Sequence, residues 1–272
     1  MIENLIFFDN PISRFYIKLF LEKNNKLKKI IFLNKKHFLP KMLINRYEFT
    51  KQNHWPLVFL RDKKILKLTN QIEEFLSLKK DFIKEVFKYD NIYQFKKEKI
   101  IYADSLSINS KEVKGVLENF QNENFLISNK EIVKQDVINM PIDLIHIHPG
   151  FLPFIKGADS SLWGPFMRGK IGGSCFYINE KIDNGEVIFR KEIDLPKFNL
   201  DYLKSKELDH IYKIWFSFVD PMLRCFILNL TISNFVKKKN SKEKFTKIQE
   251  NGQYFSFMNK DDKEVIFRKI FR

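Results

Sequence analysis

Two histidines stand one residue apart in the stretch LIHIHPGFLPFIKG, which covers residues 144 to 157. The chain has only five histidines, so placing His146 and His148 together concentrates titratable groups in one short segment. Apolar residues alternate with them and Pro149 and Gly150 follow, a pattern typical of a buried strand that ends in a loop. Residues two apart on a strand face the same side, so we expect both imidazoles to project together near the carboxyl end of that strand.

Three kinds of chemistry fit such a pair. The histidines could be structural groups, hydrogen-bonded at the edge of a core. They could bind a metal, since His-x-His on a strand is a known ligand pattern and Asp183 is available as a third ligand. The third interpretation is acid–base or oxyanion chemistry, which suits a side chain that titrates near neutrality. The residues alone leave all three open.

The elements that must position the pair form an alternating series. The sequence predicts strands at 4–8, 29–33, 99–103, 124–128 and 143–148, and helices at 11–24, 69–95, 111–120 (capped by Asn109 or Ser110) and 130–139. Alternating strands and helices indicate an α/β fold with a doubly wound, mostly parallel sheet. No glycine-rich phosphate loop follows the first strand, so a dinucleotide site is not expected there.

Glycine marks the region that follows the histidines. Seven of the nine glycines lie between Gly150 and Gly185. Glycine is needed where the backbone turns with positive φ or approaches another group closely. In open α/β sheets, ligands bind beyond the carboxyl ends of the strands, so the histidine strand points into the expected binding region.

Residues 145–188 resemble the conserved region of the folate-dependent formyltransferases, a family that includes methionyl-tRNA formyltransferase and the sugar-nucleotide N-formyltransferases. The family pattern is Asn-x-His-Pro-(Ser/Gly)-x-x-Pro, then a basic residue and Gly, then Gly-x-Thr, then Ile-Asp-x-Gly. The matching residues are His148-Pro149-Gly150, Leu152-Pro153, Lys156-Gly157, Gly172-Gly173-Ser174 and Ile182-Asp183-Asn184-Gly185. With the upstream segment 108–133, the resemblance covers roughly residues 104 to 195.

The resemblance implies a Rossmann-like domain that transfers a formyl group from N10-formyltetrahydrofolate to an amine, without a metal. His148 and Asp183 match the family's catalytic histidine and aspartate. The remaining expected site residues are Asn129, Glu180, Lys181 and Ile182 for the folate and Gly150, Lys156 and Arg168 for the acceptor substrate.

The sequence departs from the family at three positions. The family's catalytic Asn falls on His146, which we predict to replace it as the donor to the developing oxyanion. A second active-site histidine of the family falls on Phe176, and an upstream glycine falls on Asn129. These differences leave room for a divergent acceptor, another acyl donor or lost activity.

The charge favours an anionic small molecule. Lysine and arginine total 48 against 33 acidic residues, a formal charge of +15. The lysines are spread in short runs without interleaved aromatic residues, a pattern that does not favour nucleic acid. It fits either an ordinary solvated surface or a site for a phosphate-bearing substrate, and a nucleotide-linked amino sugar is the acceptor that we expect. An aminoacyl group or another small amine is the alternative, as is an inactive relative that only binds nucleotide or folate.

The remaining expectations concern location and organisation. Two cysteines without metal-ligand spacing and an N-terminus without a basic region predict a cytoplasmic protein. The apolar stretch 211–236 is interrupted by charges and a proline, so no membrane association is expected. We expect a catalytic domain at 1–195 and a smaller, partly helical extension at 196–272, in which Asp220 and Pro221 begin a helix. A homodimer stays open.

Overall fold

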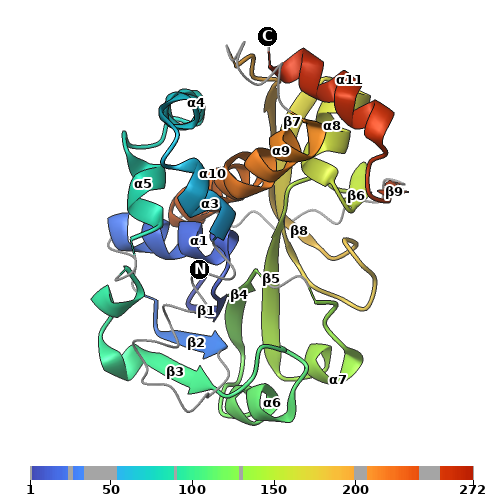
Figure 1. Cartoon of the computed structure of the whole chain (residues 1–272). Coiled ribbons are helices and arrows are strands. Elements are labelled where there is room, and N and C mark those ends of the chain that lie inside the picture. Colours follow the sequence, from blue (N-terminus) through green and yellow to red (C-terminus); the bar gives the residue numbers. More distant parts are fainter. Residues whose placement is uncertain are drawn as a thin grey trace.

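A computed structural model describes residues 2–23, 27–33, 54–88, 91–128, 131–198, 207–238 and 252–271. Its centre is a seven-stranded sheet with the order β3-β2-β1-β4-β5-β7-β8 (Figure 1). The strands are β1 (Asn4–Phe8), β2 (Lys29–Leu33), β3 (Ile100–Ala103), β4 (Glu123–Ile127), β5 (Ile142–His148), β7 (Lys170–Tyr177) and β8 (Val187–Asp194). The pairings among β1 to β5 are parallel and those of β7 are antiparallel, which confirms the predicted mostly parallel α/β sheet.

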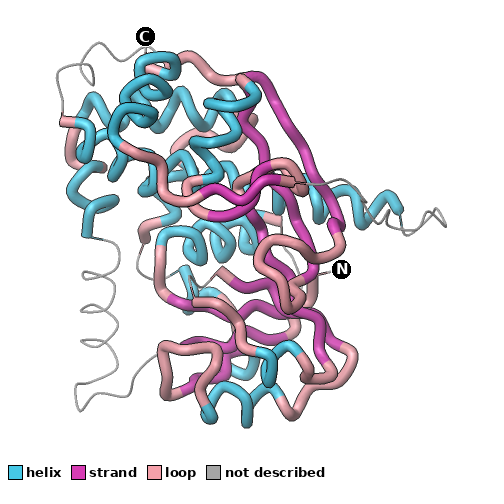
Figure 2. Tube along the Cα trace, turned by 90° about the vertical axis from the view of Figure 1, so that its right-hand side faces the viewer, coloured by secondary structure: helices cyan, strands magenta, loops and turns pink. Residues whose placement is uncertain are grey.

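Helices flank this sheet on both faces (Figure 2). The helices are α1 (Pro11–Glu22), α3 (His54–Phe59), α4 (Lys63–Phe75), α5 (Phe82–Val86), α6 (Lys111–Leu117), α7 (Gln135–Ile138), α8 (Ser160–Arg168), α9 (Leu208–Ile214), α10 (Asp220–Lys238) and α11 (Lys260–Ile270), with short helical turns η1 (Asn91–Gln94), η2 (Lys97–Lys99) and η4 (Trp215–Val219). One hydrophobic core lies between the sheet and α1, α4, α5 and α10, and a second lies under α6 and α7.

The strands form where apolar residues run together. In β1 and β2 almost every residue is buried, as expected for central parallel strands covered on both faces. The strands predicted at 4–8 and 29–33 coincide with β1 and β2, and those predicted at 99–103, 124–128 and 143–148 match β3, β4 and β5 within one residue. Ser110 caps α6 by accepting a hydrogen bond from the Val113 backbone N–H, as predicted.

One long helix predicted at 69–95 is wrong. The structure has α4, α5 and η1 in that region, and two residues with left-handed backbone, Ser77 and Asp81 with φ of 52° and 62°, lie between α4 and α5. A residue with left-handed backbone cannot continue a right-handed helix, so the helix is broken at both positions. The apolar residues nevertheless keep helical spacing across the two breaks. The buried carboxylate of Glu73 accepts hydrogen bonds from the backbone N–H groups of Asp81 and Ile83 and so fixes the second break.

The helix predicted to begin at Asp220 and Pro221 is present as α10, but Asp220 does not start it from a loop. Helical structure runs without interruption from α9 through the π-helical segment η4 into α10. Asp220 does not cap a helix, because its carboxylate accepts from Arg224 one turn further along. Pro221 has no backbone N–H to donate, and the π-helical segment η4 lies directly before Asp220 and Pro221.

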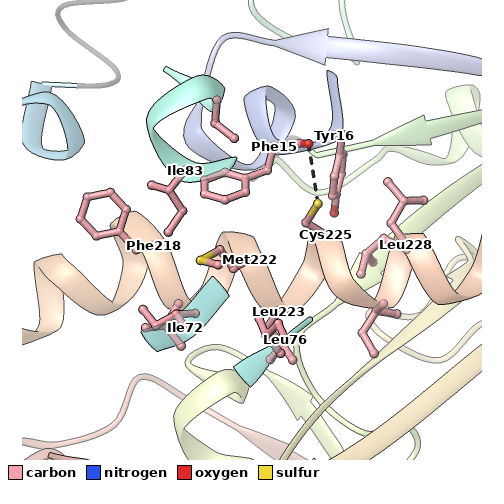
Figure 3. Packing of buried hydrophobic residues seen from close by; sticks show 14 of the residues in the cluster. Phe15, Tyr16, Ile72, Leu76, Ile83, Phe218, Met222, Leu223, Cys225 and Leu228 are labelled. Atoms are coloured by element: carbon pink, nitrogen blue, oxygen red, sulfur yellow. Dashed lines mark hydrogen bonds between the residues drawn. The ribbon is translucent and has the colours of Figure 1, made fainter. Parts of the chain in front are cut away.

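This continuous helix is a core element. By length and composition Leu208–Asn234 could cross a membrane, with a mean hydropathy of 1.2 over an 18-residue window, but 67% of that window is buried inside the protein. Figure 3 shows Met222, Leu223 and Cys225 of α10 packed among side chains from α1, α4 and α5. The Cys225 thiol contacts the Phe15 carbonyl oxygen at 3.7 Å.

A second, small sheet ties the C-terminal region to the segment after the histidine strand. Strand β6 (Ile155–Gly157) pairs in parallel with β9 (Gln253–Phe255), so that Lys156 lies opposite Tyr254 and Gly157 opposite Phe255. The two strands are very close: a Cβ at Gly157, whose φ is +92°, would lie 2.2 Å from the Phe255 carbonyl oxygen. The predicted division at residue 195 stays a prediction.

Candidate active site

His148 and Asp183 meet at the carboxyl edge of the sheet. His148 is the last residue of β5, and its Nδ1 lies 3.5 Å from Asp183 Oδ1. On its other side, His148 Nε2 lies 3.0 Å from the carbonyl oxygen of Ile155. A carbonyl can only accept, so the proton of a neutral ring lies on Nε2 and a lone pair on Nδ1 faces the carboxylate. A proton that arrives at Nδ1 would therefore be shared between His148 and Asp183.

The protonation of His148 is set by competing effects. Burial lowers the pKa of His148 from its ordinary value of 6.5, the Asp183 carboxylate opposes that shift, and the Arg224 guanidinium adds to it. The net shift is downward, so the ring is neutral near pH 7 and able to accept a proton. A buried, neutral imidazole beside a carboxylate is suited to general base chemistry.

Asp183 is held by the backbone on the other side of the site. Its Oδ2 accepts a hydrogen bond of 2.8 Å from the Gly157 N–H. Asp183 itself has φ of 48°, a conformation that aspartate tolerates better than most residues. Next to it, Lys156 Nζ donates to Asn184 Oδ1 at 2.5 Å. Strand β6 therefore fixes the Asp183–Asn184 turn through one backbone and one side-chain contact.

Hydrogen bonds also fix the loop after His148. Ser174, opposite His148 in the register of β5 and β7, donates to the Gly150 carbonyl oxygen and accepts from the Leu152 N–H, both at 2.9 Å. A Cβ at Gly150 would lie 2.7 Å from His148 Nε2 and 2.5 Å from the Ile155 carbonyl oxygen. Gly150 is therefore needed for the hydrogen bond that orients His148.

His146 lies on the same face of β5 but has different partners. Its Nδ1 is 3.1 Å from the carbonyl oxygen of Ile127, and its Nε2 is 3.3 Å from Arg224 Nη1. The carbonyl requires the proton on Nδ1, so Nε2 accepts from the guanidinium. No ring N–H remains for an oxyanion in this arrangement, which does not fit the donor role predicted for His146.

Burial and the neighbouring cation keep His146 neutral. Burial, with the Arg224 charge second, lowers the pKa of His146 from 6.5 to about 4, while the Asp183 carboxylate acts in the opposite direction. By its solvent-accessible area the ring is only partly buried. The Arg224 guanidinium occupies its Nε2 face.

Lys156 and Arg168, the predicted anion contacts, differ in their surroundings. Lys156 is buried, with 6% exposure, and lies 5.2 Å from the centre of the Tyr254 ring. Burial lowers its pKa below the ordinary value. Arg168 lies on the surface in a two-pronged ion pair with Glu192, at 2.6 and 2.9 Å, and its guanidinium stacks over Phe154. The structure brings Lys156 to His148 and Asp183, whereas the partners of Arg168 lie elsewhere.

Three of the four residues predicted to contact folate, Glu180, Lys181 and Ile182, precede Asp183 in one exposed turn. Glu180 accepts a hydrogen bond from Gln135 at 2.9 Å. The backbone N–H of Lys181 donates to the Asn179 side chain, and the carbonyl oxygen of Ile182 accepts from the Tyr254 hydroxyl. Ile182 is 51% exposed. Asn129 lies outside the described residues.

Two functional candidates escaped the sequence analysis. Arg224 and Asp220 come from α10, nearly eighty residues after the histidines, and reach the site through the core. The available signal was an Asp–Arg pair four residues apart inside an otherwise apolar helix. Charges at such positions require buried partners. From the sequence, both were interpreted as interruptions of an apolar stretch, and Asp220 also as the beginning of a helix.

The metal interpretation of the histidine pair has little geometric support. Both ring nitrogens of His146 are engaged by protein groups, and a guanidinium faces Nε2 where a cation would bind. Within the described ranges, no group of three or more His, Cys, Asp or Glu side chains is gathered as a metal site would require.

Comparison with known proteins finds similarity only among solved structures. No family model and no curated protein matches the chain. A sugar N-formyltransferase from a Shewanella species has 16% identity and a TM-score of 0.49, over 98% of this chain and 86% of that one. A 4-N formyltransferase from Francisella tularensis has 16% identity and a TM-score of 0.48, over 97% and 84%.

A third similar structure is the N-formyltransferase from Helicobacter canadensis in complex with folinic acid and dTDP-3-aminofucose. It has 15% identity and a TM-score of 0.47, over 96% of this chain and 72% of that one. At such identities none of these proteins assigns a role to a residue of this chain. The contacts of the site therefore carry the functional inference.

Proposed function

We propose that the protein is an N-formyltransferase that moves a formyl group from N10-formyltetrahydrofolate to the amine of a nucleotide-linked amino sugar. The observation that carries this proposal is the buried His148–Asp183 pair at the carboxyl edge of the sheet, with its carboxylate anchored by the Gly157 N–H. The pair stands at the positions where the sequence matches the formyltransferase pattern. It combines a proton acceptor with a fixed negative charge.

This pair suits the proton transfers of the reaction. The amine nitrogen forms a bond to the formyl carbon, the bond from that carbon to the donor nitrogen breaks, and the amine loses a proton. His148 would accept that proton at Nδ1 and share it with Asp183. The folate nitrogen needs a proton as it leaves, which the same imidazolium can return.

The turn that precedes Asp183 suits the pterin ring of N10-formyltetrahydrofolate. This donor supplies the formyl group when bound. We propose that Glu180, Lys181 and Ile182 contact it. The turn adjoins Asp183 directly and leaves Ile182 half exposed, which is unusual for isoleucine. Its backbone conformation is restrained by Asn179 and by Tyr254, so it offers a fixed surface.

The acceptor is inferred from charge. A formal charge of +15 favours a phosphate-bearing acceptor over a neutral amine. Within the site, Lys156 already has Asn184 as a partner, so any contact that it makes to an anion would accompany or replace that bond. Cytoplasmic location and a homodimer remain predictions.

A direct assay tests the proposal. The protein is incubated with N10-formyltetrahydrofolate and a panel of amino-sugar nucleotides, and release of tetrahydrofolate is followed by absorbance. We expect turnover with at least one member of the panel and none without an acceptor. Turnover only with a simple amine or an aminoacyl compound would show that the proposed acceptor class is wrong and that the proposed reaction is right.

An inactive relative is the second candidate. His146 and Phe176 stand where the family has an asparagine and a histidine, and these two replacements favour it. Their rings contact each other edge to face at 5.9 Å. Nucleotide or folate binding by calorimetry, without turnover on any acceptor, would support this candidate and contradict the transferase.

A further inference from the structure

A charged pair lies in the core helix directly behind the two histidines. Arg224 Nε donates to Asp220 Oδ1 at 2.7 Å, and the side chains are 14% and 3% exposed. Nothing in the proposed proton transfer uses either residue. Removing two charges from water costs several kcal/mol, so a pair in this position requires a reason.

Arg224 extends from this anchor to the histidine strand. Its Nη1 donates to the Ile147 carbonyl oxygen at 2.6 Å and also faces His146 Nε2 at 3.3 Å. The same nitrogen therefore contacts the backbone between the two histidines and the ring of one of them. A planar guanidinium can make these contacts while Nε remains on Asp220, which a lysine ammonium cannot do.

Within the described residues, Asp220 is the carboxylate in contact with this cation. Tyr16 on α1 lies within electrostatic reach, but burial raises the pKa of its hydroxyl well above the ordinary value, so it stays neutral. The Tyr16 hydroxyl and Asp220 Oδ2 are buried without a hydrogen-bond partner in the described part of the chain. Asp183 acts on Arg224 through space and not through a contact.

We propose that Arg224 is a positioning residue of the transfer site: anchored by Asp220, it fixes His146 as a neutral hydrogen-bond acceptor and holds a permanent positive charge beside the His148–Asp183 pair. The inference rests on the proposed function for its catalytic meaning. His146 then acts as the contact that keeps Arg224 at the strand. The Arg224 guanidinium, which matches no residue of the family pattern, supplies the positive charge of the site.

The titration behaviour of the cluster agrees with this assignment. His146 faces Arg224, Asp183 and His148, and His148 faces Asp183, Arg224 and, further away, Asp220. Among these groups Arg224 lowers the pKa of both histidines, and the carboxylates oppose it. Removing the cation should therefore raise both pKa values.

Nitrogen-15 NMR of histidine side chains tests the assignment without any substrate. In the wild type we expect His146 as the neutral Nδ1–H tautomer at pH 7, still unprotonated at pH 5.5. In Arg224→Met the Ile127 carbonyl oxygen still keeps the proton on Nδ1, but Nε2 loses its donor, so the Nε2 signal should shift. The pKa values of His146 and His148 should rise by about one unit or more. Spectra of His146→Asn and His148→Asn assign the signals.

Variants that retain the fold keep the test decisive. Arg224→Met leaves Asp220 as a lone buried carboxylate, so the Asp220→Asn, Arg224→Met double variant provides the same test without that charge. Arg224→Lys keeps a positive charge but not both contacts, so the His146 Nε2 signal should shift while the His148 pKa changes less. Arg268→Met on α11, where the arginine side chain is 78% exposed, is the matched control and should leave both histidines unchanged.

Activity adds an independent readout. In Arg224→Met, kcat should fall at least 10-fold, and the acidic limb of its pH profile should move to higher pH, because a base with a raised pKa is protonated over a wider range. A merely structural role would lower kcat without moving that limb. Histidine spectra that are the same in Arg224→Met and wild type would overturn the inference, whatever the activity. Altered spectra in a protein without formyl transfer would retain the positioning role and reject the proposed function.

Discussion

The carboxyl ends of β1 and β5 both carry buried polar side chains, but the two clusters are assembled differently. After β1, Asp9 pairs with Arg14 at 2.6 Å and Asn10 caps α1 through the Ser13 N–H. Among the described residues, these partners lie within five residues of one another, and Ser128, directly after β4, joins them from a distant part of the chain. The cluster at β1 provides hydrogen-bond partners for the first turn of α1.

The cluster at β5 draws on three other segments of the chain. His148 meets Asp183 from the turn before β8, Asp183 is held by Gly157 of β6, and His146 meets Arg224 of α10. Local polar pairs usually complete a helix end or a turn. Polar groups that converge from distant segments require the whole fold to form, so they are better candidates for chemistry.

The largest effect should come from the His148–Asp183 pair. His148→Ala and Asp183→Asn should each lower kcat for formyl transfer by about 1000-fold, because general acid–base catalysis contributes about 100- to 10,000-fold. His210→Ala, a histidine on α9 far along the chain, is the control and should retain turnover. Steady-state kinetics measure the loss. Retention of more than a tenth of the activity by His148→Ala would mean that the convergent cluster is structural.

His146 separates two roles within the same cluster. His146→Ala removes the acceptor that holds Arg224, so we expect kcat to fall by about 100-fold, the lower end of the loss for an electrostatic group. His146→Asn offers a carbonyl oxygen to Arg224 and should recover part of that loss. The Michaelis constants should change little in both variants. Equal activities for the two variants would contradict the acceptor role.

Gly150 tests how closely the loop must approach His148. In Gly150→Ala the new Cβ would meet His148 Nε2 and the Ile155 carbonyl oxygen at 2.7 and 2.5 Å, so the ring or the loop must move. Misplacement of about 1 Å typically costs up to about 100-fold, and we expect a loss of kcat of about 10-fold or more.

Gly115→Ala is the matched control for that substitution. A Cβ at Gly115 in α6 meets nothing within 4 Å, and alanine favours a helix by about 1 kcal/mol over glycine. Its melting temperature should rise with unchanged turnover, and a similar rise in Gly150→Ala would show that the loop has room.

The cluster at β1 should give the opposite result. Asp9→Asn removes the carboxylate that pairs with the buried Arg14 guanidinium and should lower the free energy of unfolding by about 3 kcal/mol. Urea unfolding measures this change. The kcat of the folded variant should stay within about threefold of wild type, since Asp9 has no part in the proton transfer. A loss of kcat without loss of stability would break the contrast between the two strand ends.

The smallest effect is a pH dependence of stability. The pKa of His146 is about 4 in the folded protein against 6.5 ordinarily, so the unfolded chain binds more protons between those values. Stability should therefore fall as the pH drops through 6.5 toward 4, by about 1 to 2 kcal/mol between pH 7.5 and pH 5. His148 contributes in the same direction. Urea unfolding at both pH values should show a smaller difference in His146→Asn, and an unchanged difference would exclude His146 as its source.

The sequence predicted the features that depend on residues close together in the chain. Alternating apolar runs predicted β1 to β5, and the two-residue spacing correctly placed His146 and His148 on one face near the end of β5. The match to the formyltransferase pattern paired His148 with Asp183, which the structure places within 3.5 Å. Each of these inferences needed only local periodicity or motif spacing.

The failures concern features that local patterns do not determine. Helical spacing continued across Ser77 and Asp81 because apolar residues were needed on the same core face on both sides of the breaks. The proline at 221 favoured a helix that starts after a loop, but helical structure already continues through the π-helical segment η4 into α10. Arg224 could be recognised only once packing of α10 against β5 was known, since no spacing links it to the histidines.

The pairing of β6 with β9 has a consequence for the order in which the protein can mature. Gly157, which holds Asp183, is itself paired with Phe255, and the Tyr254 hydroxyl reaches the Ile182 carbonyl oxygen across 72 residues of chain. A ribosome that has released the histidine strand and the aspartate turn has not yet released β9. The nascent chain can form its sheet early, but its aspartate turn gains its full support only after residue 255 has left the exit tunnel, so chains cut before β9 should lack a complete site.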